Sequence, residues 1–348
     1  MIVDKNYCMS SFLIYRAIVD QTKVFNESFP TFYFKQHSER YHIDEYEKID
    51  YVIREVIENA LSDGKCALML SSGIDSAILA KYLPKGTLAY TLRCQAPDAL
   101  DETVAASEFA AECGLEHKII DVSWDDYNYT SPMLMKHKGA PIHSIEPQIY
   151  KAALQAKKDG VRNLIFGENA DIIFGGMDGL LSRDWLFDEF VNRYMYLNPQ
   201  KILKEGEIIL EPFEKYRKGS EIDYYGFTCE YFYNEANGSY ENACTTAGVK
   251  YISPFNKMIL DMPLDFKRIR NGEPKYLLRE LFKSLYLNHE MPPKIPMPRA
   301  VDYWLKDWKG PERDEFIPNC TYGFDGNKKW MVYILEMFLN MMDGEDFR

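Results

Sequence analysis

The chain has 348 residues, of which 46% are hydrophobic, and it carries a formal net charge of −12. This length allows one large domain or two modest ones, and the composition is that of a globular protein rather than a disordered or fibrous one. Because wide contact with nucleic acid needs a basic surface, the acidic total makes a nucleic-acid partner unexpected, although a local basic patch is compatible with it.

Residues 1–45 are treated as a short N-terminal extension, rich in aromatic residues, with one strand expected at Thr31–Phe34. A helix is predicted next over Ile43–Leu61, because its apolar residues recur at three- and four-residue steps. The pair Asp63-Gly64 is expected to end this helix.

Residues 46–180 alternate between strands and helices and form the expected nucleotide-binding core. The predicted strands are Cys66–Leu70, Leu88–Leu92, His117–Val122 and Val161–Phe166. The predicted helices between them are Asp75–Tyr82, Glu102–Cys113 and Pro147–Lys158. This alternation predicts βαβ units, and therefore an α/β fold with a parallel sheet flanked by helices. Ligands of such sheets bind outside the carboxyl ends of the strands.

Residues 181–348 have a less regular pattern and predict a mainly helical C-terminal part. Two segments have the spacing of amphipathic helices, Lys275–Leu287 and Trp330–Met342.

A first motif, Leu70-Ser71-Ser72-Gly73-Ile74-Asp75-Ser76, comes directly after an apolar strand. A turn of small residues ahead of a helix exposes backbone N–H groups and hydroxyls that suit phosphate. Asp75 is out of place beside phosphate unless a cation lies between them, which suggests Mg²⁺. The alternative is that Ser72 or Asp75 simply caps the helix.

A second motif, Gly167 to Gly176, follows the strand Val161–Phe166 in the same way. It contains two acidic residues, Glu168 and Asp171. The alternative is that these carboxylates only cap and charge the first turn of a helix. Together, the two motifs predict one ATP site that handles pyrophosphate and a metal.

The first motif resembles the PP-loop of the N-type ATP-pyrophosphatase superfamily, Ser-Gly-Gly-x-Asp-Ser, with Ser72 in place of the first glycine. The second resembles Ser-Gly-Glu-Gly-Ala-Asp-Glu-Leu-Phe-Gly-Gly of the asparagine synthetase family, and differs at Phe166, Asn169 and Ile172. Further similar segments are Asp101-Glu102, Gly114-Leu115-Glu116-His117, Ser253-Pro254-Phe255 and Lys275-Tyr276-Leu277-Leu278-Arg279. The resemblance runs from about residue 45 to 310, and implies an adenine nucleotide alpha hydrolase-like fold that the C-terminal part completes.

The resemblance implies an ATP-dependent ligase that adenylates a small-molecule carboxylate and transfers ammonia or an amine, releasing AMP and pyrophosphate. It implies that Asp75 and Asp171 hold Mg²⁺ and that Glu168 acts near the amine nucleophile. The residues that it places at the nucleotide are Met69, Ser71, Ser72, Gly73, Asp75, Ser76, Leu92, Phe166 and Gly167. Met69 and Leu92 are also compatible with the core of the sheet.

The family takes a catalytic cation from an Arg-x-Lys segment, and its Lys would fall near Ala300 here. Lys294 or Arg299 is therefore expected to supply the charge from a shifted position, although either is equally compatible with a surface role.

Asparagine synthetase begins with a glutaminase domain whose nucleophile is an N-terminal Cys, whereas residue 2 here is Ile and only some 45 residues precede the similar region. We therefore expect the nitrogen to come from free ammonia, from a separate glutaminase partner or from another amine.

The seven cysteines include no CxxC pair, which suits a reducing compartment and makes a zinc ribbon unexpected. No apolar run reaches the ~18 residues of a membrane span, and no secretory signal is evident. The expected location is the cytoplasm. Two other functions remain open, namely a PP-loop enzyme that modifies RNA or a sugar, and a non-catalytic nucleotide-binding interaction module.

Overall fold

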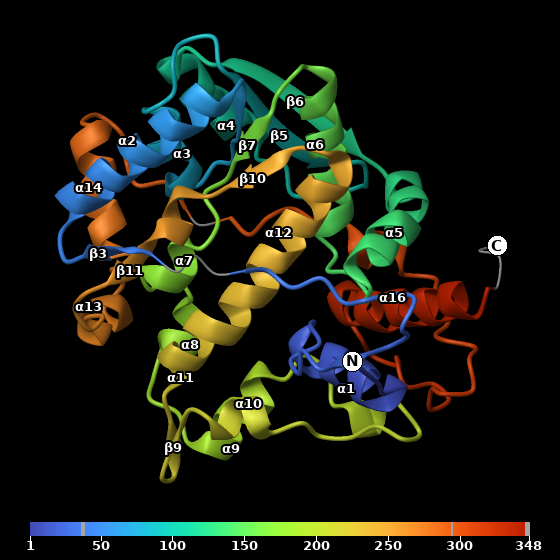
Figure 1. The fold of residues 1–348 in the computed structure, drawn as a ribbon. Coiled ribbons are helices and arrows are strands. Elements are labelled where there is room, and N and C mark those ends of the chain that lie inside the picture. The colour runs from blue at the N-terminus through green and yellow to red at the C-terminus, as the bar shows by residue number, and fades with distance from the viewer. Residues whose placement is uncertain (36–38, 294, 345–348) are drawn as a thin grey trace.

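The computed structural model describes residues 1–35, 39–293 and 295–344. At its centre is a five-stranded sheet with the order β10-β7-β4-β5-β6, in which every neighbouring pair is parallel (Figure 1). The strands are β4 (Cys66–Met69), β5 (Leu88–Cys94), β6 (Glu116–Val122), β7 (Asn163–Ile165) and β10 (Lys250–Ile252). The predicted α/β class with a parallel sheet is confirmed.

Helices cover both faces of this sheet. One face carries α2 (Tyr46–Asp63), α3 (Ile74–Ala80), α4 (Thr103–Cys113) and α14 (Tyr276–Leu285). The other carries α6 (Glu146–Lys158) and α12 (Tyr233–Ala247), with α5 (Trp124–Lys138) packed on these two helices and α16 (Gly326–Asp343) packed on α5. Successive strand residues point to opposite faces, so Leu68 and Ala89 join one hydrophobic cluster while Ala67 and Leu88 join the other.

The ends of several helices follow from local chemistry. Ser123 and Asp126 form a reciprocal capping box that begins α5, and Gly139 ends it in the left-handed conformation, with φ 65°. Helix α5 was not predicted, because Pro132 lies inside it and its apolar residues do not gather on one side. Strand β10 was not predicted either, because it is only three residues long and lies at the sheet edge.

The strand expected at Thr31–Phe34 is wrong. Described residues 31–35 are irregular, and the Phe32 N–H donates a single hydrogen bond, 2.8 Å long, to the Lys138 carbonyl at the end of α5. The last carbonyls of a helix point along its axis and do not form the row of donors and acceptors that a strand pairs with. The aromatic side chains serve packing instead, as in the 5.7 Å contact between the rings of Phe32 and His137.

The remaining elements are short, apart from α1. The helices are α1 (Lys5–Tyr15), α7 (Ala170–Ile173), α8 (Asp178–Leu181), α9 (Phe187–Tyr194), α10 (Glu211–Glu214), α11 (Tyr224–Phe227), α13 (Phe266–Arg270) and α15 (Val301–Trp304), with η1 (Pro199–Lys201), η2 (Thr228–Phe232) and η3 (Pro254–Lys257). The two-stranded pairs are β1 (Ile2–Val3) with β2 (Lys23–Val24), β3 (Tyr41–Ile43) with β11 (Met258–Leu260), and β8 (Arg217–Lys218) with β9 (Glu221–Ile222). Among the described helices, none combines the length and apolarity that crossing a bilayer requires.

The N-terminal segment packs into the same cores as the rest of the chain. Phe12 of α1 lies in the cluster that also contains Tyr127 of α5 and Trp330 of α16, and Figure 1 shows α1 beside α16. Trp330 is 1% exposed, and its ring nitrogen donates to the Ile142 carbonyl at 3.1 Å. This indole therefore ties α16 to the loop between α5 and α6.

We expect Trp330→Ala to lower the free energy of unfolding by about 3–5 kcal/mol, because it leaves a large cavity and an unpaired carbonyl. Tyr129→Ala is the matched control, since Tyr129 is 83% exposed, and it should change stability by less than about 0.5 kcal/mol. Chemical denaturation of both variants measures the difference. Equal losses would contradict the role given to Trp330.

Candidate functional site

The two motifs leave neighbouring strands of the sheet. The first follows β4 and the second follows β7, and these strands pair with Leu68 opposite Ile165. The chain adds β5 and β6 on one side of β4, and β7 and β10 on the other. The strand order therefore reverses between β4 and β7, and the crevice outside the carboxyl ends at such a point is where open parallel sheets bind ligands.

Ser71 and Ser76 close the turn that follows β4. The Ser71 N–H donates to the Ser76 hydroxyl at 2.9 Å, and the two hydroxyl oxygens lie 2.8 Å apart. The Gly73 N–H donates to the Ser71 hydroxyl at 3.2 Å. These bonds fix the backbone of the turn just before α3 begins, with Ser71, Gly73 and Ser76 all at the edge of one cavity.

Ser72 replaces a glycine of the PP-loop pattern, and Glu102 accommodates it. The Ser72 backbone N–H and hydroxyl both donate to Glu102 Oε2 at 3.0 Å, and both residues are buried. Burial raises the pKa of Glu102, and the bonds from Ser72 oppose that rise. Glu102 lines the cavity and Ser72 does not, so Ser72 shapes the turn rather than the cavity wall.

Gly167 allows the two motifs to touch. A Cβ atom at this position would lie 3.0 Å from the Cβ of Asp75 and 3.1 Å from the backbone nitrogen of Ser76. Both contacts are tighter than ordinary van der Waals contact, so a side chain here would require the neighbouring turn to shift by a few tenths of an ångström. The absence of a side chain at residue 167 therefore brings the turn after β7 directly against the turn after β4.

Asn169 stands where the family pattern has glycine, and it occupies the left-handed region with φ 72°. Asparagine tolerates this region better than most residues. The Asn169 amide donates to Asn237 Oδ1 at 2.8 Å and to Asn256 Oδ1, and the Asn256 amide donates to Asn237 Oδ1 at 2.6 Å. This buried amide cluster fixes the turn that carries Glu168 and Asp171.

Asp75 and Asp171 converge on one cation, the ammonium of Lys275. Lys275 Nζ lies 2.7 and 3.0 Å from the two carboxylate oxygens of Asp75, and 3.0 Å from Asp171 Oδ1. Burial alone would lower the pKa of Lys275, but the two aspartates more than reverse this and raise it above its usual value. Lys275 comes immediately before α14 in the left-handed conformation, with φ 54°, so the position of the cation is linked to that helix.

Glu168 lies beside this ion cluster and has the electrostatics of a proton acceptor. Burial raises its pKa to about 7, and the negative charges of Asp171 and Glu235 add to that rise. A hydrogen bond from Tyr240 acts in the opposite direction. A carboxyl group with this pKa can take up or release a proton near neutral pH.

The cavity between the two motifs has a volume of about 280 Å³. It is lined by the residues expected at the nucleotide other than Ser72, namely Met69, Ser71, Gly73, Asp75, Ser76, Leu92, Phe166 and Gly167. Glu168 and Asp171 line it as well. The cavity is thus lined both by apolar side chains at the strand ends and by carboxylates on the turns.

Of the two candidates for the catalytic cation, only Arg299 lies among the described residues, and it does not line this cavity. Arg299 lines a different cavity and bonds to His143 at 3.3 Å. Lys294 lies outside the described residues. Arg93, which follows Leu92 on β5, forms an exposed ion pair with Asp121 at 2.7 Å and does not line the cavity.

Four polar residues of the cavity were not anticipated as site residues, and Glu102, from the similar segment Asp101-Glu102, is the first of them. Lys275 and Arg279 belong to the segment Lys275-Tyr276-Leu277-Leu278-Arg279, which resembles the family. That resemblance could have identified both as site residues. Tyr240, on α12, had no recognisable motif. The position of Tyr240 depends on how α12 packs across the sheet, and a local sequence pattern carries no information about that packing.

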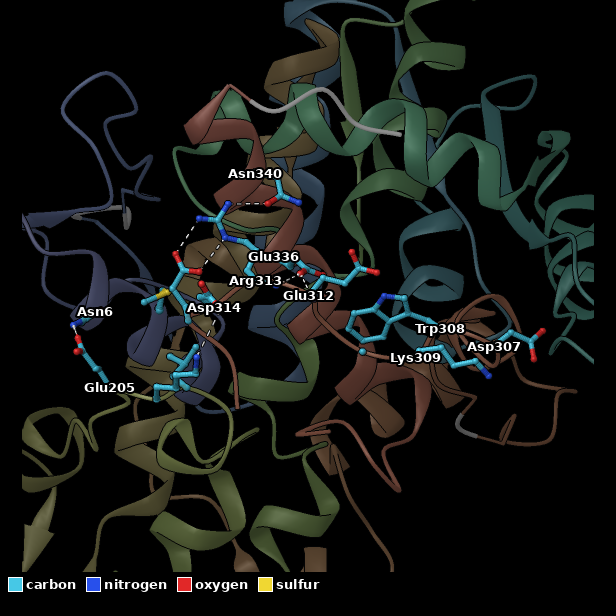
Figure 2. Close-up of a pocket in the computed structure, with 15 residues that line it drawn as sticks. Asn6, Glu205, Asp307, Trp308, Lys309, Glu312, Arg313, Asp314, Glu336 and Asn340 are labelled. Atoms are coloured by element: carbon cyan, nitrogen blue, oxygen red, sulfur yellow. Dashed lines mark hydrogen bonds and ion pairs between the residues drawn. The ribbon is translucent and has the colours of Figure 1, made fainter. Parts of the chain in front are cut away.

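A larger hollow of about 1080 Å³ lies elsewhere, between the N-terminal and C-terminal segments (Figure 2). It includes none of the motif residues, and several of its charged side chains pair with one another or with amides. Arg313 bonds to Glu315 at 2.9 Å and to Asn340 at 2.8 Å, while Asn6 donates to Glu205 at 2.8 Å. Because the larger hollow has no motif residue and several of its polar groups are already paired, the smaller cavity between the motifs is the candidate site.

We expect Lys275→Met to destabilise the protein by roughly 2–4 kcal/mol, because it leaves two half-buried carboxylates facing each other. The loss should be larger at pH 8 than at pH 5, since one carboxyl group can take up a proton in acid and relieve the repulsion. Thermal unfolding at both pH values measures this. Lys48→Met, which breaks an exposed pair with Asp44, is the control, and a pH-independent loss at Lys275 would contradict the interpretation.

The comparisons with known proteins agree with this geometry. The asparagine synthase family model matches residues 48–223, slightly more than half of the chain, and the match spans β4, β7 and both motifs. No glutaminase-domain family is matched. No match was found among the curated proteins. The chain therefore belongs to the asparagine synthase family, an ATP-dependent family of amide-forming ligases.

Proposed function

We propose that this protein is an AMP-forming carbon–nitrogen ligase. It adenylates a small-molecule carboxylate with ATP, releases pyrophosphate, and transfers the acyl group to ammonia or to an amine. The observation that carries the proposal is the convergence of Asp75, Asp171 and Glu168 on one cavity at the switch point of the sheet.

The adenine end of ATP is proposed to lie against Met69, Leu92 and Phe166, which give the cavity its apolar wall. The triphosphate then extends over the turn from Ser71 to Ser76. Lys275 and Arg279 border the same space and supply positive charge for the pyrophosphate that leaves. This arrangement places the α-phosphate between the two motifs.

The donor set fits Mg²⁺. Asp75 and Asp171 present carboxylate oxygens that lie within 3.0 Å of a single point, the Lys275 ammonium. Mg²⁺ in nucleotide sites takes one or two carboxylates and completes its shell with phosphate oxygens and water. The described residues contain no group of three or more metal-ligating side chains, which is consistent with an ion held jointly by the protein and the nucleotide. Bound there, it would neutralise charge on the triphosphate.

Glu168 is the proposed general base for the second half-reaction. It takes a proton from the incoming amine as the nitrogen attacks the acyl-adenylate. Its pKa of about 7 allows it to be ionised before the attack and protonated after it. The source of the nitrogen is proposed to be ammonia, an amine, or a separate glutaminase acting as a partner.

The test of the proposal is exchange of labelled pyrophosphate into ATP across a panel of carboxylic acids with Mg²⁺. At least one acid should support exchange. Asp171→Asn should reduce the rate by at least about 100-fold, because it removes an ionised ligand at the triphosphate. Asp121→Asn, at the exposed pair with Arg93, is the control. Absence of exchange with every acid would overturn the proposal, and absence of nucleotide binding by calorimetry would favour a non-catalytic module.

A second prediction separates the two half-reactions. Glu168→Gln should retain pyrophosphate exchange but lose amide formation by about 100-fold or more, because adenylation does not need the base. In the wild type, amide formation should fall tenfold per pH unit below about pH 7, as Glu168 takes up its proton. Rates of both half-reactions from pH 5.5 to 8.5 measure this. Equal loss of exchange and amide formation in the variant would contradict the role of Glu168.

A further inference from the structure

A second cavity, of about 230 Å³, lies beside the candidate site and is lined by an unusual set of cations. Arg16, His143, Tyr196 and Arg299 form one part of its wall. The other part is the start of α16, where Asp325, Asn327 and Lys328 are exposed. The cavity therefore has an exposed side at α16 and a more buried side at the two arginines.

The two guanidinium groups meet at His143. Arg16 Nη1 lies 2.7 Å, and Arg299 Nη1 3.3 Å, from His143 Nε2. A guanidinium can only donate, so Nε2 must accept and the ring proton must reside on Nδ1. Burial lowers the pKa of His143 far below its usual value, and the charges of Arg16 and Arg299 lower it further. The histidine is thus neutral and does not balance either arginine.

Only one of the two arginines has a carboxylate partner among the described residues. Arg16 Nη2 bonds to Glu235 at 2.9 Å, whereas Arg299 forms no ion pair within the described part of the chain and has the neutral His143 as its hydrogen-bond partner. Arg16 Nε and His143 Nδ1 are buried without a hydrogen-bond partner there. The cluster has more donors than acceptors, and a carboxylate consists of acceptors alone.

The cavity lies at the same edge of the sheet as the candidate site. Helix α6 leads into the start of β7, so its own beginning, next to His143, lies at the carboxyl ends of the strands. The Cys94 thiol at the end of β5 contacts the Pro298 carbonyl at 3.5 Å, which holds the segment before Arg299 at this edge. Met297 of that segment lines the ATP cavity, while Arg299 lines the cationic one.

Tyr240 and Glu235 connect the two cavities electrostatically. Burial and Glu168 raise the pKa of Tyr240, and the Arg299 charge opposes them. Glu235, the partner of Arg16, contributes to the raised pKa of Glu168. Glu168 therefore offers a carboxylate in the adenylation cavity, and the neighbouring cavity offers two guanidiniums that suit a carboxylate.

We infer that the cavity at Arg16 and Arg299 binds the carboxylate of an amino acid, and that this amino acid is the amine that the enzyme acylates. The inference rests on the proposed function. In the step concerned, the amine nitrogen forms a bond to the acyl carbon, the bond from that carbon to AMP breaks, and the amine proton passes to Glu168. The carboxylate stays bound to the guanidiniums and orients the nitrogen.

The test compares amines with and without a carboxylate, once pyrophosphate exchange has identified an acid. The twenty amino acids, their amides and ammonium chloride serve as nucleophiles. At least one amino acid should react with a kcat/KM at least 50-fold above that of its own amide. Arg299→Gln should raise KM for that amino acid at least tenfold and leave pyrophosphate exchange unchanged, and Arg299→Lys should recover part of the loss.

Arg93→Gln is the matched control, because it removes an exposed arginine from an ion pair outside both cavities, and it should behave as the wild type. Three results would overturn the inference. In the first, ammonia has the highest kcat/KM of all nucleophiles. In the second, amino acids and their amides react equally well. In the third, Arg299→Gln lowers the rate of pyrophosphate exchange with the acid and leaves the KM for the amine unchanged.

Calorimetry separates failure of this inference from failure of the proposed function. If no acid supports exchange, the proposed function fails, and the twenty amino acids are titrated directly into the protein. Binding that is lost in Arg299→Gln and retained in Arg93→Gln would still support the amino-acid site. No binding of any amino acid, or binding that Arg299→Gln leaves intact, would overturn it.

Discussion

The contact between two strand-end turns is the constraint on which the rest of the site depends. Gly167 has no side chain, so the turn after β7 reaches the backbone at Asp75 and Ser76. At this separation, carboxylates from both turns reach the same ammonium group. The sheet supplies the approach, because β4 and β7 are neighbours whose connections run in opposite directions.

The two cavities at the carboxyl-end edge of the sheet differ in how their charged side chains are paired. In the cavity between the two motifs, the Lys275 ammonium pairs with two aspartates of the described structure. In the neighbouring cavity, Arg299 is held by a neutral imidazole and has no carboxylate among the described residues. The ion pairs of Lys275 stabilise the fold at the site. The guanidinium of Arg299 remains able to bind an anion, and leaving it without a carboxylate partner lowers the stability of the protein.

Local signals were sufficient to predict four of the five strands of the central sheet and both motifs. The helix α2 follows from the spacing of its apolar residues, and β4 from its apolar run before small residues. What the sequence did not predict depends on contacts between distant segments. Lys275 reaches Asp75 across 200 positions of sequence, and Tyr240 reaches the cavity only through the crossing of α12. Arg299 was assigned to the cation role from its position in a motif, but its side chain is turned toward His143.

The amide cluster at Asn169 restricts how this site can change over evolution. A glycine at residue 169 would satisfy the backbone, yet it would leave Asn237 and Asn256 without an amide that each now contacts. With glycine at residue 169, Asn237 would keep its bonds to Tyr233 and Asn256, while Asn256 Oδ1 would lose the amide that now donates to it. An exchange of Asn169 for glycine is therefore coupled most directly to residue 256, where a side chain without a buried acceptor would remove that cost.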